Sequence, residues 1–151
     1  MVRLGRLVRF SVNPFLGEDS VGCNSYASKP AGEGLTIFLE LAAELVGPVQ
    51  PQTGLVVNVT EIDKVVRRFA VPVFAKEIRE RLGRGEHMPL REVLQVLWLA
   101  HRHLADKFDV AQVDRLALKL NPFRKVTMDT KAPGMMYFSE KYEFAATHKL
   151  W

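Results

Sequence analysis

The order of the patterned segments is the feature that most constrains this chain. Residues 60–82 and 90–108 carry apolar side chains at three- and four-residue spacings, and both segments lie in the middle of the 151-residue sequence. Strand-like segments lie before and after these expected helices. A parallel doubly wound sheet requires strands and helices in alternation, so this order argues against one. It predicts an α+β fold with an antiparallel sheet that helices cover on one face.

The expected strands are recognised by alternating or β-favouring apolar runs between turn residues. They are predicted at residues 4–12, 35–46, 55–59, 113–120, 125–129 and 135–148. Residues 15–34 are rich in Gly, Ser, Asn and Pro, which predicts a long loop. The turn residues at 121–124 predict a hairpin. The expected order is strand, strand, helix, helix, strand, strand, with an extra C-terminal strand.

A capping residue, a proline and two glycines set the expected limits of the helices. Thr60 is predicted to be the N-cap of the first helix, with Asp63 in the first turn, where a carboxylate complements the helix dipole. Pro72 supplies no amide hydrogen, so the helix must kink or restart there. The glycines at positions 83 and 85 predict the end of the restarted part.

The composition indicates an ordinary globular domain. The chain is 48% hydrophobic and 25% charged, which suits a single domain with its own core. Its 21 Lys and Arg residues are mixed with 17 Asp and Glu residues, so we expect no nucleic-acid partner. No apolar run is long enough to span a bilayer and no secretory segment is recognisable. With Cys23 as the single cysteine, these features predict no membrane association and a cytoplasmic location.

Three short motifs resemble one known family. Residues 51–62 read Pro-Gln-Thr-Gly-Leu-Val-Val-Asn-Val-Thr-Glu-Ile, residues 22–24 read Gly-Cys-Asn, and residues 144–150 read Phe-Ala-Ala-Thr-His-Lys-Leu. They are similar to the helix entry, the catalytic cysteine loop and the first strand of the 6-pyruvoyl and 6-carboxy tetrahydropterin synthases. The resemblance implies a tunnelling fold (T-fold), in which the sheets of several units join edge to edge into a barrel.

The position of the third motif suggests a duplicated arrangement. In the family that motif belongs to the first strand, whereas here it lies near the last residue. We therefore expect a degenerate T-fold unit over residues 1–131 and the first strand of a second unit over residues 135–151. Either a longer protein or another subunit would complete the second unit. The resemblance also implies a homo-oligomer formed through sheet edges.

The resemblance implies few site residues in this chain. Cys23 corresponds to the family's catalytic thiol, and His148 corresponds to a zinc ligand whose partner ligands are absent. Where the first unit should provide its three histidines, the sequence has Phe-Ser-Val-Asn-Pro at 10–14 and Ala-Gly-Glu-Gly at 31–34. The glutamate that anchors the pterin is replaced near Asn121. The alternatives are an unreactive loop thiol at position 23 and an ordinary strand residue at position 148.

The other three histidines are weaker candidates. His101 lies in the apolar stripe of its helix, which is typical of a core or interface residue. His103 is two residues away, so a helix directs the two side chains apart. His87 lies in Gly-Glu-His-Met, which does not match the family's Asp-His segment.

The resemblance implies membership of a zinc-dependent lyase family that acts on dihydroneopterin triphosphate, in biopterin or queuosine synthesis. Because most of the site is missing, this chain is predicted to lack a complete active site of its own. The competing hypothesis is a non-catalytic T-fold unit that serves oligomerisation or binds a pterin-like small molecule. An unrelated small α+β domain is the third possibility.

Overall fold

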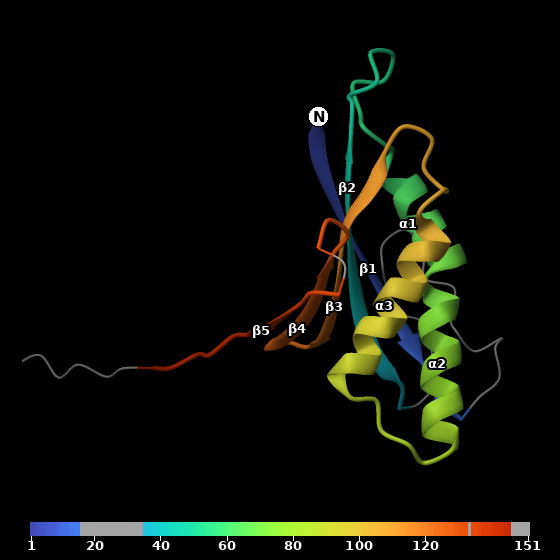
Figure 1. Cartoon of the computed structure of the whole chain (residues 1–151), viewed down its shortest axis with the longest axis vertical. Helices are drawn as coiled ribbons and strands as arrows, with labels where there is room; N and C mark the ends of the chain where they lie inside the picture. The colour runs from blue at the N-terminus through green and yellow to red at the C-terminus, as the bar shows by residue number, and fades with distance from the viewer. Residues whose placement is uncertain (16–34, 133, 146–151) are drawn as a thin grey trace, which may run out of the picture.

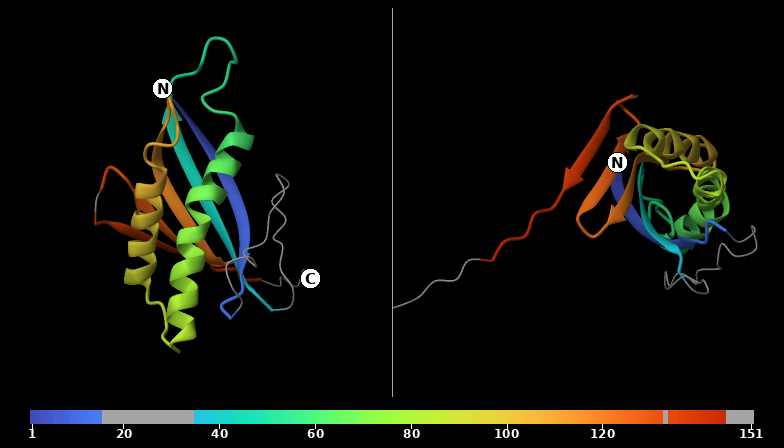
Figure 2. Two further views of the ribbon diagram at one scale, coloured as in Figure 1. Left: turned by 90° about the vertical axis from the view of Figure 1, so that its right-hand side faces the viewer. Right: turned by 90° about the horizontal axis from the view of Figure 1, so that it is seen from below.

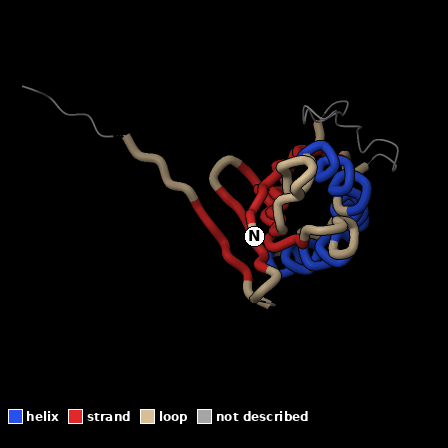
Figure 3. Tube along the Cα trace, turned by 90° about the horizontal axis from the view of Figure 1, so that it is seen from above, coloured by secondary structure: helices blue, strands red, loops and turns tan. Residues whose placement is uncertain are grey.

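The computed structural model describes residues 1–15, 35–132 and 134–145 (Figure 1). In chain order its elements are β1 (Val2–Val12), β2 (Ile37–Gly47), α1 (Val59–Phe69), α2 (Val71–Gly83), α3 (Leu90–Leu104), β3 (Gln112–Asn121), β4 (Arg124–Asp129) and β5 (Met136–Glu140). The strands form one antiparallel sheet in the order β1-β2-β3-β4-β5, and the helices pack on one side of it (Figures 2 and 3). The predicted α+β class and the one-sided helix layer are confirmed. None of the described helices is long and apolar enough to cross a membrane.

The β1–β2 pairing is regular, whereas the register shifts once between β2 and β3 and once between β3 and β4. β1 and β2 pair without a shift along their whole length, from Val2 opposite Gly47 to Val12 opposite Ile37. A β-bulge between β2 and β3 leaves Asp114 without a partner residue in the register. β5 pairs with β4, so the outer edges of β1 and β5 have no neighbouring strand in the described part of the chain.

The core lies between the sheet and the helices. Alternate residues of each strand face the helices, including Val8, Phe10 and Leu41, which have no exposed surface. The rings of Phe10 and Phe74 meet with centroids 5.8 Å apart, which joins β1 to α2. The opposite side of the sheet, which we call the helix-free face, is not covered by any described helix (Figure 3).

The break between the first two helices lies where Pro72 predicts it. α1 ends at Phe69, and α2 begins at Val71 with the proline in its first turn. Proline is tolerated there because the first amides of a helix have no acceptor within the helix. The start of α1 is two residues earlier than predicted, since Asn58 and not Thr60 is the N-cap. The Asn58 side-chain oxygen accepts a hydrogen bond from the Thr60 amide at 2.9 Å.

Two predicted strands are wrong in whole or in part. Residues 55–58 form no strand, because the loop closes on itself with a Gln50 amide to Leu55 carbonyl bond of 2.9 Å and helix α1 begins at Val59. Val56 and Val57 are nevertheless buried, so their apolar character serves the core and not a sheet. The last strand stops at Glu140, and residues 141–145 have no strand pairing. Helix α3 also ends four residues earlier than predicted, at Leu104.

Candidate functional site

One end of the sheet gathers several segments that the resemblance associates with function. β1 ends there at Val12, β2 begins at Ile37, and the hairpin between β3 and β4 turns there. β5 also ends there, because Glu140 pairs with Arg124 at the start of β4. The chain on both sides of the Cys23 loop therefore meets the sheet at the same end as the hairpin (Figure 2).

The two predicted site residues lie outside the described residues. Cys23 falls in the segment 16–34 and His148 in the segment 146–151, and Glu33 belongs to the first of these. Residues 141–145, which lead to His148, run away from the body of the protein (Figure 1). The described flanks of the two candidates are therefore not brought together within this chain.

The described residues do not fit a zinc site. No group of three or more His, Cys, Asp or Glu side chains in residues 1–15, 35–132 and 134–145 could hold a metal ion. Where the family places its first histidine, Phe10 and Val12 are fully buried in the core and Ser11 is buried on the other side of the strand. His87 lies in the loop before α3, His103 lies in α3, and both are exposed.

A pocket of about 240 Å³ lies at the β3–β4 hairpin and the end of β5. We call it the hairpin pocket, and its lining residues are Lys119, Asn121, Pro122, Phe123, Arg124, Lys125, Ser139, Glu140 and Lys141. The Asn121 side-chain oxygen accepts a hydrogen bond of 2.9 Å from the Phe123 amide. That oxygen is committed to its own turn, so it is a poor replacement for a carboxylate that anchors a pterin ring.

The helix-free face carries ion pairs that cross the strands. Glu40 is 8% exposed and lies 2.8 Å from Arg9 Nε on β1 and 2.8 Å from Lys119 Nζ on β3. The hydrogen bond from Lys119, with a further contribution from Arg9, holds the pKa of the Glu40 carboxyl below its usual range. Glu40 therefore stays ionised and ties three strands together.

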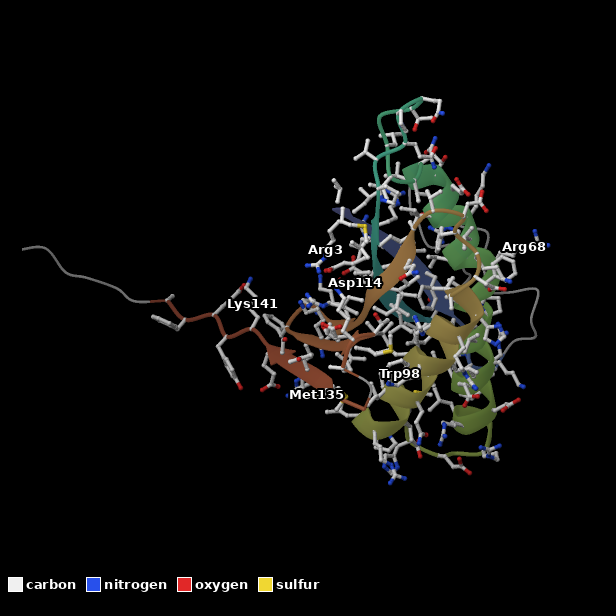
Figure 4. The ribbon with its side chains drawn as sticks, turned by 45° about the horizontal axis from the view of Figure 1, so that its top comes forward. Arg3, Arg68, Trp98, Asp114, Met135 and Lys141 are labelled. Atoms are coloured by element: carbon white, nitrogen blue, oxygen red, sulfur yellow. The ribbon has the colours of Figure 1, made fainter. Side chains whose placement is uncertain are left out.

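A second charged cluster surrounds the bulge of β3. Asp114 is 2% exposed, and its carboxylate lies 2.7 Å from Arg3 Nη2 and 2.8 Å from Lys131 Nζ. Arg3 and Asp114 are seen close together in Figure 4. The hydrogen bond from Lys131 lowers the pKa of Asp114, so the cluster is a structural charge network at neutral pH.

An apolar pocket of about 230 Å³ lies under helices α2 and α3 at the same end of the sheet. Its lining includes Ile37, Phe74, Met88, Val93 and Leu120, and contains no charged residue. It continues the hydrophobic core, and it offers no polar group that could orient a substrate.

His101 has a structural environment, as its position in the apolar stripe predicts. Its ring meets the Trp98 ring edge-on with centroids 5.7 Å apart, and burial lowers the pKa of its imidazole. The folded state then binds a proton less readily than the unfolded chain. We expect the free energy of unfolding to fall as the pH drops below about 6.5, and to be unaffected by this residue above that pH.

Chemical denaturation at several pH values checks this expectation. His101→Gln should reduce the loss of stability between pH 7 and pH 5.5, whereas His103→Gln, at an exposed position of the same helix, should leave it unchanged. Equal pH profiles for wild type and His101→Gln would contradict the proposed effect of burial.

Comparison with known proteins does not identify a family for this chain. No protein-family model matches the chain, and no curated protein matches it. Only the three motifs and the α+β architecture relate this chain to the tetrahydropterin synthases.

The charged residues of the hairpin pocket were missed by the sequence reasoning. The hairpin itself was predicted, but its register was not, and only the register places Lys119 opposite Lys125. The near-symmetric spacing of these two lysines about the turn at 121–124 is the signal that could have revealed the pair.

Proposed function

We propose that this chain is a T-fold unit of the tetrahydropterin synthase kind, which acts by joining its sheet edge to edge with other units. The observation that carries the proposal is the sheet itself, which has helices on one side and no described strand beside the outer edges of β1 and β5. A T-fold assembly uses both features, because neighbouring sheets continue each other and the helix layer remains outside. This arrangement supports the proposed homo-oligomer.

The β5 edge supports an assembled state. Tyr137 and Phe138 are 46% and 41% exposed, and beyond the strand Tyr142 and Phe144 are 80% and 93% exposed. Exposed aromatic residues beside an unpaired strand edge favour uncontrolled association in an isolated protein. A neighbouring strand with its own helix layer would cover these rings and satisfy the edge.

The helix-free face suits the interior of a barrel. In an assembly of this kind that face lines the central channel, where water must be tolerated. The cross-strand pairs of Glu40 with Arg9 and Lys119, and of Arg115 with Asp129 at 3.0 Å, make this face polar without leaving those carboxylates unpaired. Such a charged face would be unsuitable for packing against a second layer of helices.

The chemistry of the family, if the assembly performs it, would belong to a site that no single unit completes. Cys23 would supply the thiol and His148 one zinc ligand, and the remaining ligands and the acceptor for a pterin-like substrate would come from another unit. The competing function is a non-catalytic T-fold unit in the cytoplasm. The Asn121 oxygen, which is already used by the Phe123 amide, favours this second candidate for the unit formed by residues 1–131.

Zinc content and lyase activity distinguish the two functions. For the first, we expect the purified protein to bind zinc and to convert dihydroneopterin triphosphate, with zinc lost in His148→Ala and turnover lost in Cys23→Ala. For the second, we expect neither zinc nor turnover in an assembled, folded protein. Zinc retained in His148→Ala would refute the ligand assignment.

Assembly is tested by sedimentation velocity. We expect the wild-type chain to sediment as an oligomer, and we expect the double variant Phe138→Lys, Tyr142→Lys to shift toward monomer because buried charges at the new interface are costly. Val49→Lys is the matched control, since Val49 is 45% exposed in a loop away from β5. If the wild-type chain is folded by circular dichroism and yet sediments as a monomer at micromolar concentrations, edge-to-edge assembly of this chain is refuted.

A further inference from the structure

Two lysines face each other across the hairpin pocket. Lys119 on β3 and Lys125 on β4 are direct partners in the strand register, and Ser139 is the partner of Lys125 on β5. Directly opposed like charges destabilise an antiparallel pair. Such a pair is therefore unfavourable unless anions lie close to the ammonium groups.

The protein itself compensates this charge only in part. Lys119 Nζ lies 2.8 Å from Glu40, but the same carboxylate also receives Arg9 at 2.8 Å. Lys125 has no ion-pair partner among the described residues. One buried carboxylate thus serves two cations, and a third cation beside them has none.

The other two cations of the lining have carboxylate partners. Arg124 is 57% exposed and pairs with Glu140 at 2.6 Å, but Glu140 also accepts a hydrogen bond of 2.6 Å from the Tyr142 hydroxyl. Lys141 lines the same pocket and pairs with Glu143, which is not part of the lining. Four cationic side chains and one carboxylate therefore surround the cavity.

The size of the cavity limits what it can hold. At about 240 Å³ it is smaller than the roughly 300–1,000 Å³ of a usual small-molecule pocket. It therefore suits a single multivalent anionic group, with any remainder of the ligand outside. Primary ammonium groups act as point charges with three donors each, and phosphate oxygens are their common partners.

We propose that the hairpin pocket binds a phosphate group, either as the free ion or as part of a phosphorylated small molecule. Lys119 and Lys125 hold the anion between them, Arg124 adds a donor from the turn, and the Ser139 hydroxyl is available beside Lys125. The inference stands on the register and the pocket alone, so it does not depend on the proposed function.

Calorimetric titration of the full chain with inorganic phosphate at low ionic strength tests the proposal. We expect saturable binding that Lys125→Gln weakens by about tenfold or more, since a charge-assisted contact is lost. Lys64→Gln, an exposed lysine on α1, is the control and should leave the affinity unchanged. Tighter binding of glycerol 3-phosphate than of phosphate would identify a phosphorylated small molecule as the ligand, and equal binding would identify the free ion.

Thermal unfolding gives a second test, in which the substitution stabilises the phosphate-free protein although it weakens phosphate binding. Without phosphate, Lys125→Gln should raise the melting temperature because the repulsion from Lys119 is removed. With phosphate, the wild type should gain stability and the variant should not. Equal stabilisation of wild type and Lys125→Gln by phosphate, or no saturable binding by the wild type, would overturn the proposal.

Discussion

Phe10→Ala is expected to lower the free energy of unfolding by about 3–5 kcal/mol. Phe10 is fully buried where β1 passes under α2, and its ring meets the Phe74 ring at 5.8 Å. Alanine would remove the ring and leave a cavity between the sheet and the helix layer. The surrounding strands are held by their neighbours, so they cannot collapse to fill it. Equilibrium urea denaturation measures the loss.

Phe38→Ala is the matched control for this prediction. Phe38 lies on the adjacent strand β2, opposite Ser11, but it points to the helix-free face and is 47% exposed. Its replacement should cost less than about 1 kcal/mol, since little buried surface is lost. Similar losses for the two variants would mean that the helix-free face is as well packed as the core, contrary to the one-sided layer architecture.

Local chemistry made part of the fold predictable. Pro72 marks the helix break because the ring removes an amide hydrogen whatever the surroundings, and Asn121 marks the hairpin because its side chain closes the turn. The position of the helices between the strands was also enough to predict an antiparallel sheet. Each of these inferences needs only a few neighbouring residues or the order of the elements.

Other features depended on tertiary contacts and could not be predicted locally. Val56 and Val57 have strong strand preference, but they are buried in a loop that leads directly to the Asn58 cap. Residues 141–145 continue the apolar and aromatic pattern of β5, yet no described strand lies beside them. A period-two pattern reports burial on one face, and it does not report whether a hydrogen-bonding partner exists.

The candidate site was predicted only as far as its motifs allow. Cys23 and His148 remain predictions, because both lie outside the described residues. The absence of a glutamate near Asn121 is visible in the sequence, whereas the pairing of Lys119 with Lys125 depends on the register of β3 and β4. Charge pairing across a sheet is a property of register, which short motifs do not determine.

Asp63→Asn is expected to destabilise the protein by about 2–3 kcal/mol, because it removes the charge from a nearly buried ion-pair network. The Asp63 side chain is 4% exposed, 2.7 Å from Arg67 Nε and 3.3 Å from Arg6 Nη2. The sequence placed Asp63 in the first turn as a dipole partner, but the helix begins at Val59 and the carboxylate joins α1 to β1 instead. Arg6 is 27% exposed and Arg67 is 16% exposed, so water screens part of the electrostatic interaction that the substitution removes.

A double-mutant cycle separates the ion pair from the loss of either side chain alone. If Asp63 and Arg67 are coupled, Arg67→Met should cost clearly less in the Asp63→Asn background than in the wild type. Arg67 also donates a hydrogen bond of 3.0 Å to the Arg9 carbonyl, so its single replacement should not be neutral even without Asp63. Asp106→Asn, which alters an exposed pair with Lys107, should leave the free energy of unfolding nearly unchanged. Additive effects of the first two substitutions would show that Asp63 stabilises the contact of α1 with β1 through Arg6 and not through Arg67.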